Sequence, residues 1–123
     1  MPTSRAPQIS QHDHVTLVQL GDEYKNLDEH SLEDISTILL DLAKSIDPPL
    51  MVLDLSHTKF FGSAFIELMF RTWNKIKVRD GGKFSISGLS KTCREVVEVT
   101  HIDRLWPVFE TSEEAIESLR NET

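Results

Sequence analysis

The sequence predicts a single α/β domain. Stretches with the apolar pattern of strands alternate along the chain with stretches that have the spacing of amphipathic helices, in the order β-α-β-α-β-α-β-α. One part of this series, residues 50–87, has the pattern strand, helix, strand, which normally forms a parallel pair with a right-handed crossover. The chain has 123 residues, enough for one domain with a core of its own.

The first half of the chain supplies two strands and a helix. Residues 15–20 (VTLVQL) favour a strand, and Gly21 marks a turn after it. Ser31 is followed three residues later by Asp34, a pattern typical of a helix start, and apolar residues then recur at helical spacing up to Ile46. Residues 50–55 (LMVLDL) are nearly all apolar, as expected of a strand that is covered on both faces.

The second half supplies the remaining elements. A long amphipathic helix is expected to end near Val78, and residues 83–87 (KFSIS) alternate like a strand. Ser90 is the expected cap of a third helix, and residues 108–109 are expected to form a short last strand. Residues 111–114 (TSEE) have the pattern of a capping box that starts a final helix.

The bulk composition excludes several classes of protein. With 39% hydrophobic and 27% charged residues the chain resembles ordinary globular proteins, and no apolar run approaches the ~20 residues that cross a bilayer. The net charge of −7 disfavours nucleic-acid binding, which usually needs a basic patch. The basic residues at 71–79 are interpreted as a solvated helix face. Residues 1–13 are polar and are expected to be a flexible tail before a domain at 14–123.

No pattern of a catalytic or metal site is present. The single cysteine, Cys93, cannot form an internal disulfide or a cysteine metal cage, and its spacing predicts a small core residue in a reducing, cytoplasmic protein. The five histidines lack the helical pairing that zinc hydrolases use, and neither a phosphate-binding glycine loop nor a nucleophile elbow occurs. We therefore expect no metal, no cofactor and no enzymatic activity.

One serine has two interpretations. Ser63 lies between a strand's exit turn and the start of a helix, where serine commonly caps the helix. The same position offers free backbone N–H groups and the positive end of the helix dipole, which suits a phosphate. Phosphorylation would add about −1.5 to −2 charge there, next to a surface expected to contain Phe61 and Phe65. Helix capping and regulated phosphorylation both remain open on this reasoning.

Several segments resemble one family. The run Leu53-Asp54-Leu55-Ser56 followed by Phe60-Phe61-Gly62-Ser63 is similar to the signature of anti-sigma factor antagonists, the STAS domains. Residues 81–90 (GGKFSISGLS) and 100–109 (THIDRLWPVF) resemble two further family segments, and residues 27–31 and 111–116 resemble two more. The resemblance covers about residues 14–120, and the pieces occur in the family's order.

The resemblance implies a fold and a function. The fold would be a mixed, mostly parallel sheet of four to five strands with about four helices. The protein would bind an anti-sigma factor with a histidine-kinase-like ATPase fold and so release a sigma factor. That partner would phosphorylate Ser63, and a phosphatase would reset the switch. The partner-binding surface would contain the acidic residue and the neighbours of the serine: Asp28, Thr58, Phe61, Gly62, Ala64 and Phe65. Homodimerisation is left open.

The sequence also departs from the family pattern around the serine. Gly62 stands where the family usually has Asp, Ala64 where a second Ser or Thr is common, and Phe65 where a Gly lets the partner's backbone approach. These departures motivate two alternatives. One is an unphosphorylated STAS scaffold subunit of a lipid-transport ATPase, and the other is a STAS module that senses a nucleotide or small molecule.

Overall fold

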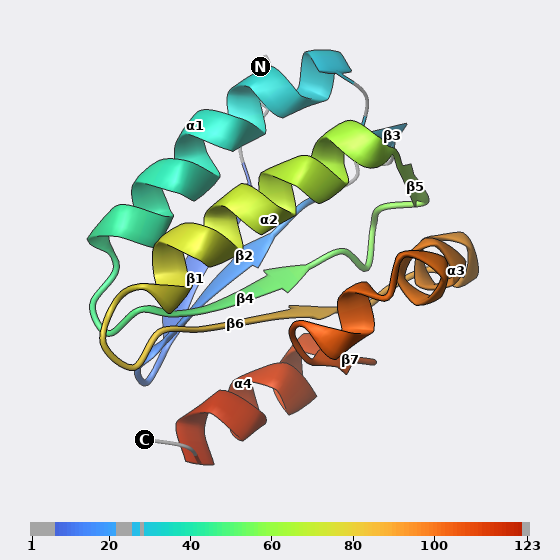
Figure 1. Cartoon of the computed structure of the whole chain (residues 1–123). Coiled ribbons are helices and arrows are strands. Elements are labelled where there is room, and N and C mark those ends of the chain that lie inside the picture. Colours follow the sequence, from blue (N-terminus) through green and yellow to red (C-terminus); the bar gives the residue numbers. More distant parts are fainter. Residues whose placement is uncertain (1–6, 22–25, 28, 122–123) are drawn as a thin grey trace, which may run out of the picture.

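The computed structural model describes residues 7–21, 26–27 and 29–121 (Figure 1). Strands and helices alternate along it much as the sequence predicts. In chain order the elements are β1 (Gln8–His12), β2 (Val15–Gln19), β3 (Asn26–Leu27), α1 (Glu29–Ser45), β4 (Leu50–Asp54), β5 (Phe60–Phe61), α2 (Ser63–Lys77), β6 (Lys83–Ser87), α3 (Lys91–Thr100), a short 3-10 helix (Ile102–Arg104), β7 (Val108–Phe109) and α4 (Ser112–Asn121).

The main sheet has five strands in the order β1-β2-β4-β6-β7. All neighbours run parallel except β1, which pairs antiparallel with β2. The expected mixed, mostly parallel sheet with four helices is therefore confirmed. A separate two-stranded parallel ladder joins β3 to β5 at the start of α2.

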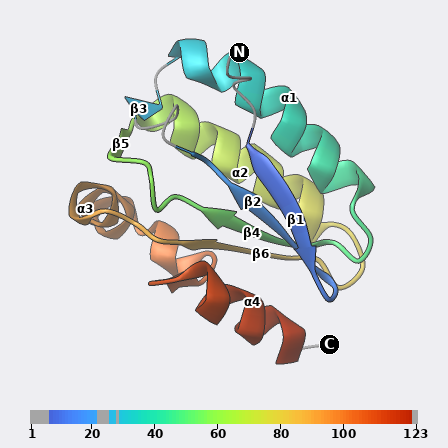
Figure 2. The same ribbon diagram turned by 180° about the vertical axis from the view of Figure 1, so that it is seen from behind.

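Helices cover the sheet on both faces (Figure 1, Figure 2). The strands divide their side chains by the two-residue alternation of β structure. On β4, Met51 and Leu53 belong to the larger core with α1 and α2, whereas Leu50 and Val52 pack in a smaller core with α4. The nearly continuous apolar run of this strand follows from its burial on both faces.

The N-terminal segment corrects one expectation. Part of the tail expected at residues 1–13 is strand β1, in which Ile9 lies opposite Val18 and His12 opposite Val15. The two-residue turn between the strands places Asp13 at a φ of 60°. Strand β1 lies at the edge of the sheet, and its mostly polar, mostly exposed side chains suit that position. Pairing with β2 makes it a strand although its sequence lacks an apolar pattern. Residues 1–6 lie outside the described part of the chain.

The helix starts test the capping predictions. Ser90 caps α3, accepting a hydrogen bond from the Cys93 backbone N–H at 3.2 Å, and Thr111 accepts one from the Glu114 N–H at 3.2 Å, so both predictions are confirmed. The predicted start at Ser31 is wrong. Helix α1 already begins at Glu29, and this serine therefore lies inside its first turn. Asp28 lies outside the described residues.

Candidate functional site

The predicted serine lies at the first residue of α2. This helix starts beyond the carboxyl ends of the parallel strands, the edge where open α/β sheets commonly bind their ligands. Gly62 is the N-cap residue, with φ −105° and ψ −169° and no side chain to cap the helix. Its carbonyl accepts the first helical bonds, from the N–H groups of Phe65 and Ile66, both at 3.2 Å. Ser63 is therefore not the cap, and that interpretation is wrong.

Ser63 lies at an accessible position in the first turn of α2. Its side chain is exposed, and the first turn of α2 contains no acidic residue. Two basic residues, Lys75 and Lys77, lie in the last turn of this 15-residue helix. There they complement the negative, C-terminal end of the helix dipole. The first turn of α2 therefore carries no carboxylate that would offset the positive end of the helix dipole.

Three side chains expected at the partner surface are buried instead. Thr58 and Phe61 are each 1% exposed and Phe65 is 0% exposed. The rings of Phe61 and Phe65 lie 5.3 Å apart between centroids, one on each side of Ser63 in the sequence. The prediction that these two rings form an apolar contact surface is therefore wrong. Both are core residues, and they anchor the segment that contains Ser63 from both sides. Gly62 is half-buried and Ala64 is exposed, as a surface role requires.

The exposed aromatic residue of this segment is Phe60, which the sequence reasoning did not assign to the site. Its side chain is 49% exposed, and it precedes the buried Phe61 in β5. Successive side chains of a strand point to opposite sides, so one of the two must face outward. Because both residues are phenylalanine, the local sequence does not indicate which of the two faces outward.

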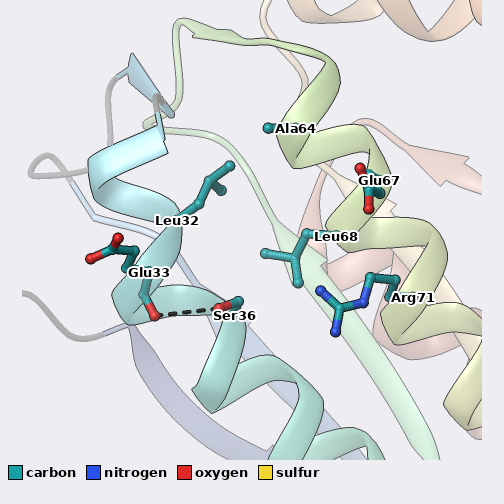
Figure 3. A pocket seen from close by; sticks show the side chains of 7 residues that line it. All are labelled: Leu32, Glu33, Ser36, Ala64, Glu67, Leu68 and Arg71. Carbon is teal, nitrogen blue, oxygen red and sulfur yellow. Dashed lines mark hydrogen bonds between the residues drawn. The ribbon is translucent and has the colours of Figure 1, made fainter.

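A groove between α1 and α2 continues the exposed surface from Ala64 (Figure 3). Its volume is about 250 Å³. Leu32 and Leu68 approach each other from the two helices, and the Arg71 guanidinium reaches toward the groove from α2 (Figure 3). The exposed Glu67 lies one turn beyond Ala64 on the same helix. A partner that covers Ser63 would meet this partly apolar groove next.

The loop between β4 and β5 is held by a buried carboxylate. Asp54, only 3% exposed, accepts hydrogen bonds from the Ser56 hydroxyl at 2.6 Å and the Ser87 hydroxyl at 2.9 Å. Gly88 has a φ of +74°, and a Cβ there would come within 2.9 Å of the Asp54 Oδ1. This glycine therefore allows the close approach of the chain after β6 to the carboxylate. The sequence reasoning missed this anchor, although Asp54 stood in the family-like motif.

Other predicted features have these positions. Cys93 is buried in the larger core as expected, and burial raises the pKa of its thiol. Among the described residues, no group of three or more His, Cys, Asp or Glu side chains could hold a metal ion.

Of the basic residues at 71–79, Arg71 and Lys77 are exposed, while the Arg79 Nη1 donates to the Ala43 carbonyl at 3.1 Å. Within the described part of the chain, no helix is both long and apolar enough to span a membrane.

The uncapped start of α2 supports a first testable prediction. A Cβ at Gly62 would meet nothing within 4 Å, and the backbone there is in the β region that N-cap residues prefer. We expect Gly62→Asp to raise the free energy of unfolding by about 0.5–1 kcal/mol, because the carboxylate accepts an N–H of the first turn and complements the dipole. Urea denaturation measures this change. Gly62→Ala is the control, since it adds a side chain without an acceptor; an equal gain in that variant would contradict capping.

Comparisons with known proteins agree on the kind of domain. The family model of the STAS domain matches residues 6–115. The anti-sigma-F factor antagonist RsfB of Mycobacterium tuberculosis is 24% identical over 120 residues, which cover 97% of this chain and 93% of that protein.

Solved structures share the fold. An anti-sigma-factor antagonist (STAS) domain protein from Planctomyces limnophilus superposes with a TM-score of 0.86 and 33% identity, over 95% of this chain and 99% of that one. The Bacillus cell fate determinant SpoIIAA in its phosphorylated form gives a TM-score of 0.70 with 19% identity, over 93% of this chain and 99% of that one. At that identity the second likeness concerns the fold alone.

Proposed function

Because this chain belongs to the STAS-domain family, we propose that it is a cytoplasmic anti-sigma factor antagonist that acts by binding and not by catalysis. Its partner would be an anti-sigma serine kinase, whose capture releases a sigma factor, and phosphorylation of Ser63 would switch the binding off. The observation that carries the proposal is the exposed hydroxyl at the first residue of α2, in a first turn without acidic residues. The relatives reported above are named as anti-sigma factor antagonists, so the lipid-transport scaffold and the sensor are not favoured.

In the unphosphorylated state, the partner would dock over the start of α2. The surface available there consists of the exposed Phe60, Ser63 and Ala64, and the groove of Leu32 and Leu68 continues it. A half-exposed aromatic ring beside small residues is a common anchor in protein interfaces. The buried Phe61 and Phe65 would contribute by holding this surface in place.

Phosphoryl transfer would use chemistry that the kinase supplies. The Ser63 Oγ would attack the γ-phosphorus of the ATP bound by the partner, so that the new O–P bond forms as the bond to ADP breaks. The hydroxyl proton would pass to a base on the kinase. The helix N-terminus of α2 favours the resulting anion through its dipole and the N–H groups of its first turn, which the N-cap side chain does not cap.

The phosphoryl group would then oppose binding. It adds about −1.5 to −2 charge in the middle of the surface that the partner covers. An uncompensated charge inside a dry interface costs several kcal/mol, and each ~1.4 kcal/mol is a factor of ten in affinity. A phosphatase would restore the binding form. Gly62, in place of the family's usual Asp, removes one negative charge from the residue before the acceptor.

Intact-mass spectrometry tests the proposal. Wild type and Ser63→Ala are incubated with ATP and each histidine-kinase-like anti-sigma factor from the same cell. We expect one added phosphoryl group in the wild type with one of these kinases, and none in the variant. Modification of both proteins would place the phosphate elsewhere. If no kinase modifies the wild type, phosphorylation is excluded and an unphosphorylated scaffold becomes the better interpretation.

A further inference from the structure

The first turn of α3 touches the loop that leads to Ser63. The Ser90 hydroxyl donates to the Lys59 carbonyl at 3.1 Å, and the Cys93 thiol donates to the Thr58 carbonyl at 3.9 Å. The Cys93 sulfur also interacts with the backbone of Phe61, two residues before the serine. Helix α3 thus contacts the segment between β4 and α2 at Thr58, Lys59 and Phe61.

The same loop is held at its beginning by Asp54. Its carboxylate accepts from Ser56, and the Thr58 N–H donates to the Leu55 carbonyl at 3.0 Å. The Leu55 N–H in turn donates to the Ser87 carbonyl at 2.8 Å. The loop is therefore pinned to β6 at one end and to α3 at the other, and its last residues enter α2 directly.

Ser90 is distinctive because its one hydroxyl group serves two elements. The oxygen accepts the Cys93 N–H at 3.2 Å and so caps α3, while the hydroxyl hydrogen is donated to Lys59. Capping needs only an acceptor, whereas the bond to the loop needs a donor. These two functions can therefore be separated by substitution.

We propose that Ser90 is a positioning residue for the phosphorylation site: its hydroxyl donor ties the β4–α2 loop to α3 and so places Ser63 for phosphoryl transfer. This inference rests on the proposed function. Ser63 is the fourth residue after Lys59, and the two buried phenylalanines on either side of the serine, Phe61 and Phe65, are already in the core. A shift of the loop at Lys59 is thereby transmitted to the start of α2. Small displacements of an acceptor strongly reduce transfer rates.

Three variants separate positioning from helix capping. Ser90→Thr keeps both the acceptor and the donor, Ser90→Asp keeps the acceptor alone, and Ser90→Ala removes both. In the thermal unfolding of the full chain, Ser90→Ala should lose more stability than Ser90→Asp, because only the alanine variant also loses the cap of α3. In hydrogen–deuterium exchange, the amides of residues 58–63 should exchange roughly tenfold faster in the Ala and Asp variants and at the wild-type rate in the Thr variant.

The kinetic readout uses the kinase identified by mass spectrometry. We expect kcat for Ser63 phosphorylation to fall roughly 10- to 100-fold in both the Ala and the Asp variants, with a smaller change in KM, and to be restored in the Thr variant. Wild-type loop exchange or a wild-type kcat in Ser90→Asp would overturn the inference. If no kinase phosphorylates the wild type, the proposed function fails, while the exchange data still decide whether Ser90 holds the loop.

Discussion

Ser63→Asp is expected to weaken binding of the anti-sigma kinase by at least about 100-fold, whereas Ser63→Ala is expected to bind as tightly as the wild type. Ser63 lies at the exposed start of α2, where the partner would cover it. Removing the hydroxyl leaves the surface neutral, but a buried carboxylate without a partner costs several kcal/mol. With ~1.4 kcal/mol for each factor of ten, that cost gives a loss of this size. Isothermal titration calorimetry with the purified kinase measures both affinities.

A matched control comes from the other side of the sheet. Ser112 is the first residue of α4, so it holds the same helical position as Ser63 on the opposite face (Figure 1, Figure 2). Ser112→Asp should leave the affinity unchanged, because the added charge lies away from the proposed interface. An equal loss in this variant would mean that net charge, and not the site, controls binding. Equal affinities of Ser63→Asp and Ser63→Ala would refute the switch.

Phe61→Ala is expected to lower the free energy of unfolding by about 3–5 kcal/mol, and Phe60→Ala by less than about 1 kcal/mol. The two adjacent residues have the same chemistry, but Phe61 is 1% exposed and packs against Phe65, while Phe60 is 49% exposed. Truncating the buried ring removes its transfer free energy and leaves a cavity. Urea denaturation reports both values when it is followed by the fluorescence of Trp73 and Trp106, whose ring centroids lie 5.3 Å apart.

Phe60→Ala is expected to affect the affinity for the kinase more than it affects stability. Phe60→Ala, although stable, is expected to weaken the kinase complex roughly tenfold, because an exposed aromatic beside Ser63 suits an interface anchor. Phe61→Ala should be compared only under conditions in which it remains folded. Equal losses of stability in the two variants would contradict the assignment of Phe61 to the core and Phe60 to the surface.

Much of the fold follows from local pattern. The apolar run of β4 and the helical spacing that ends near Val78 each identify an element without its neighbours, because burial repeats with the period of the backbone. The caps at Ser90 and Thr111 could also be predicted, since a cap is a contact between residues three apart. Strand β1 could not, because its polar residues show no periodicity and its order comes from pairing with β2.

For the site, the sequence by itself determined the family, the α/β order and the serine that opens α2. These depend on residues close together in the chain. Only the tertiary structure decided that Phe60 faces outward while Phe61 and Phe65 face the core, and that Asp54 and Ser90 hold the loop before Ser63. The physical reason is that such roles depend on contacts between distant segments. Lys59 and Ser90, for example, are 31 residues apart in the sequence. The spacing of apolar residues within one strand does not show which of its two sides such distant contacts bury.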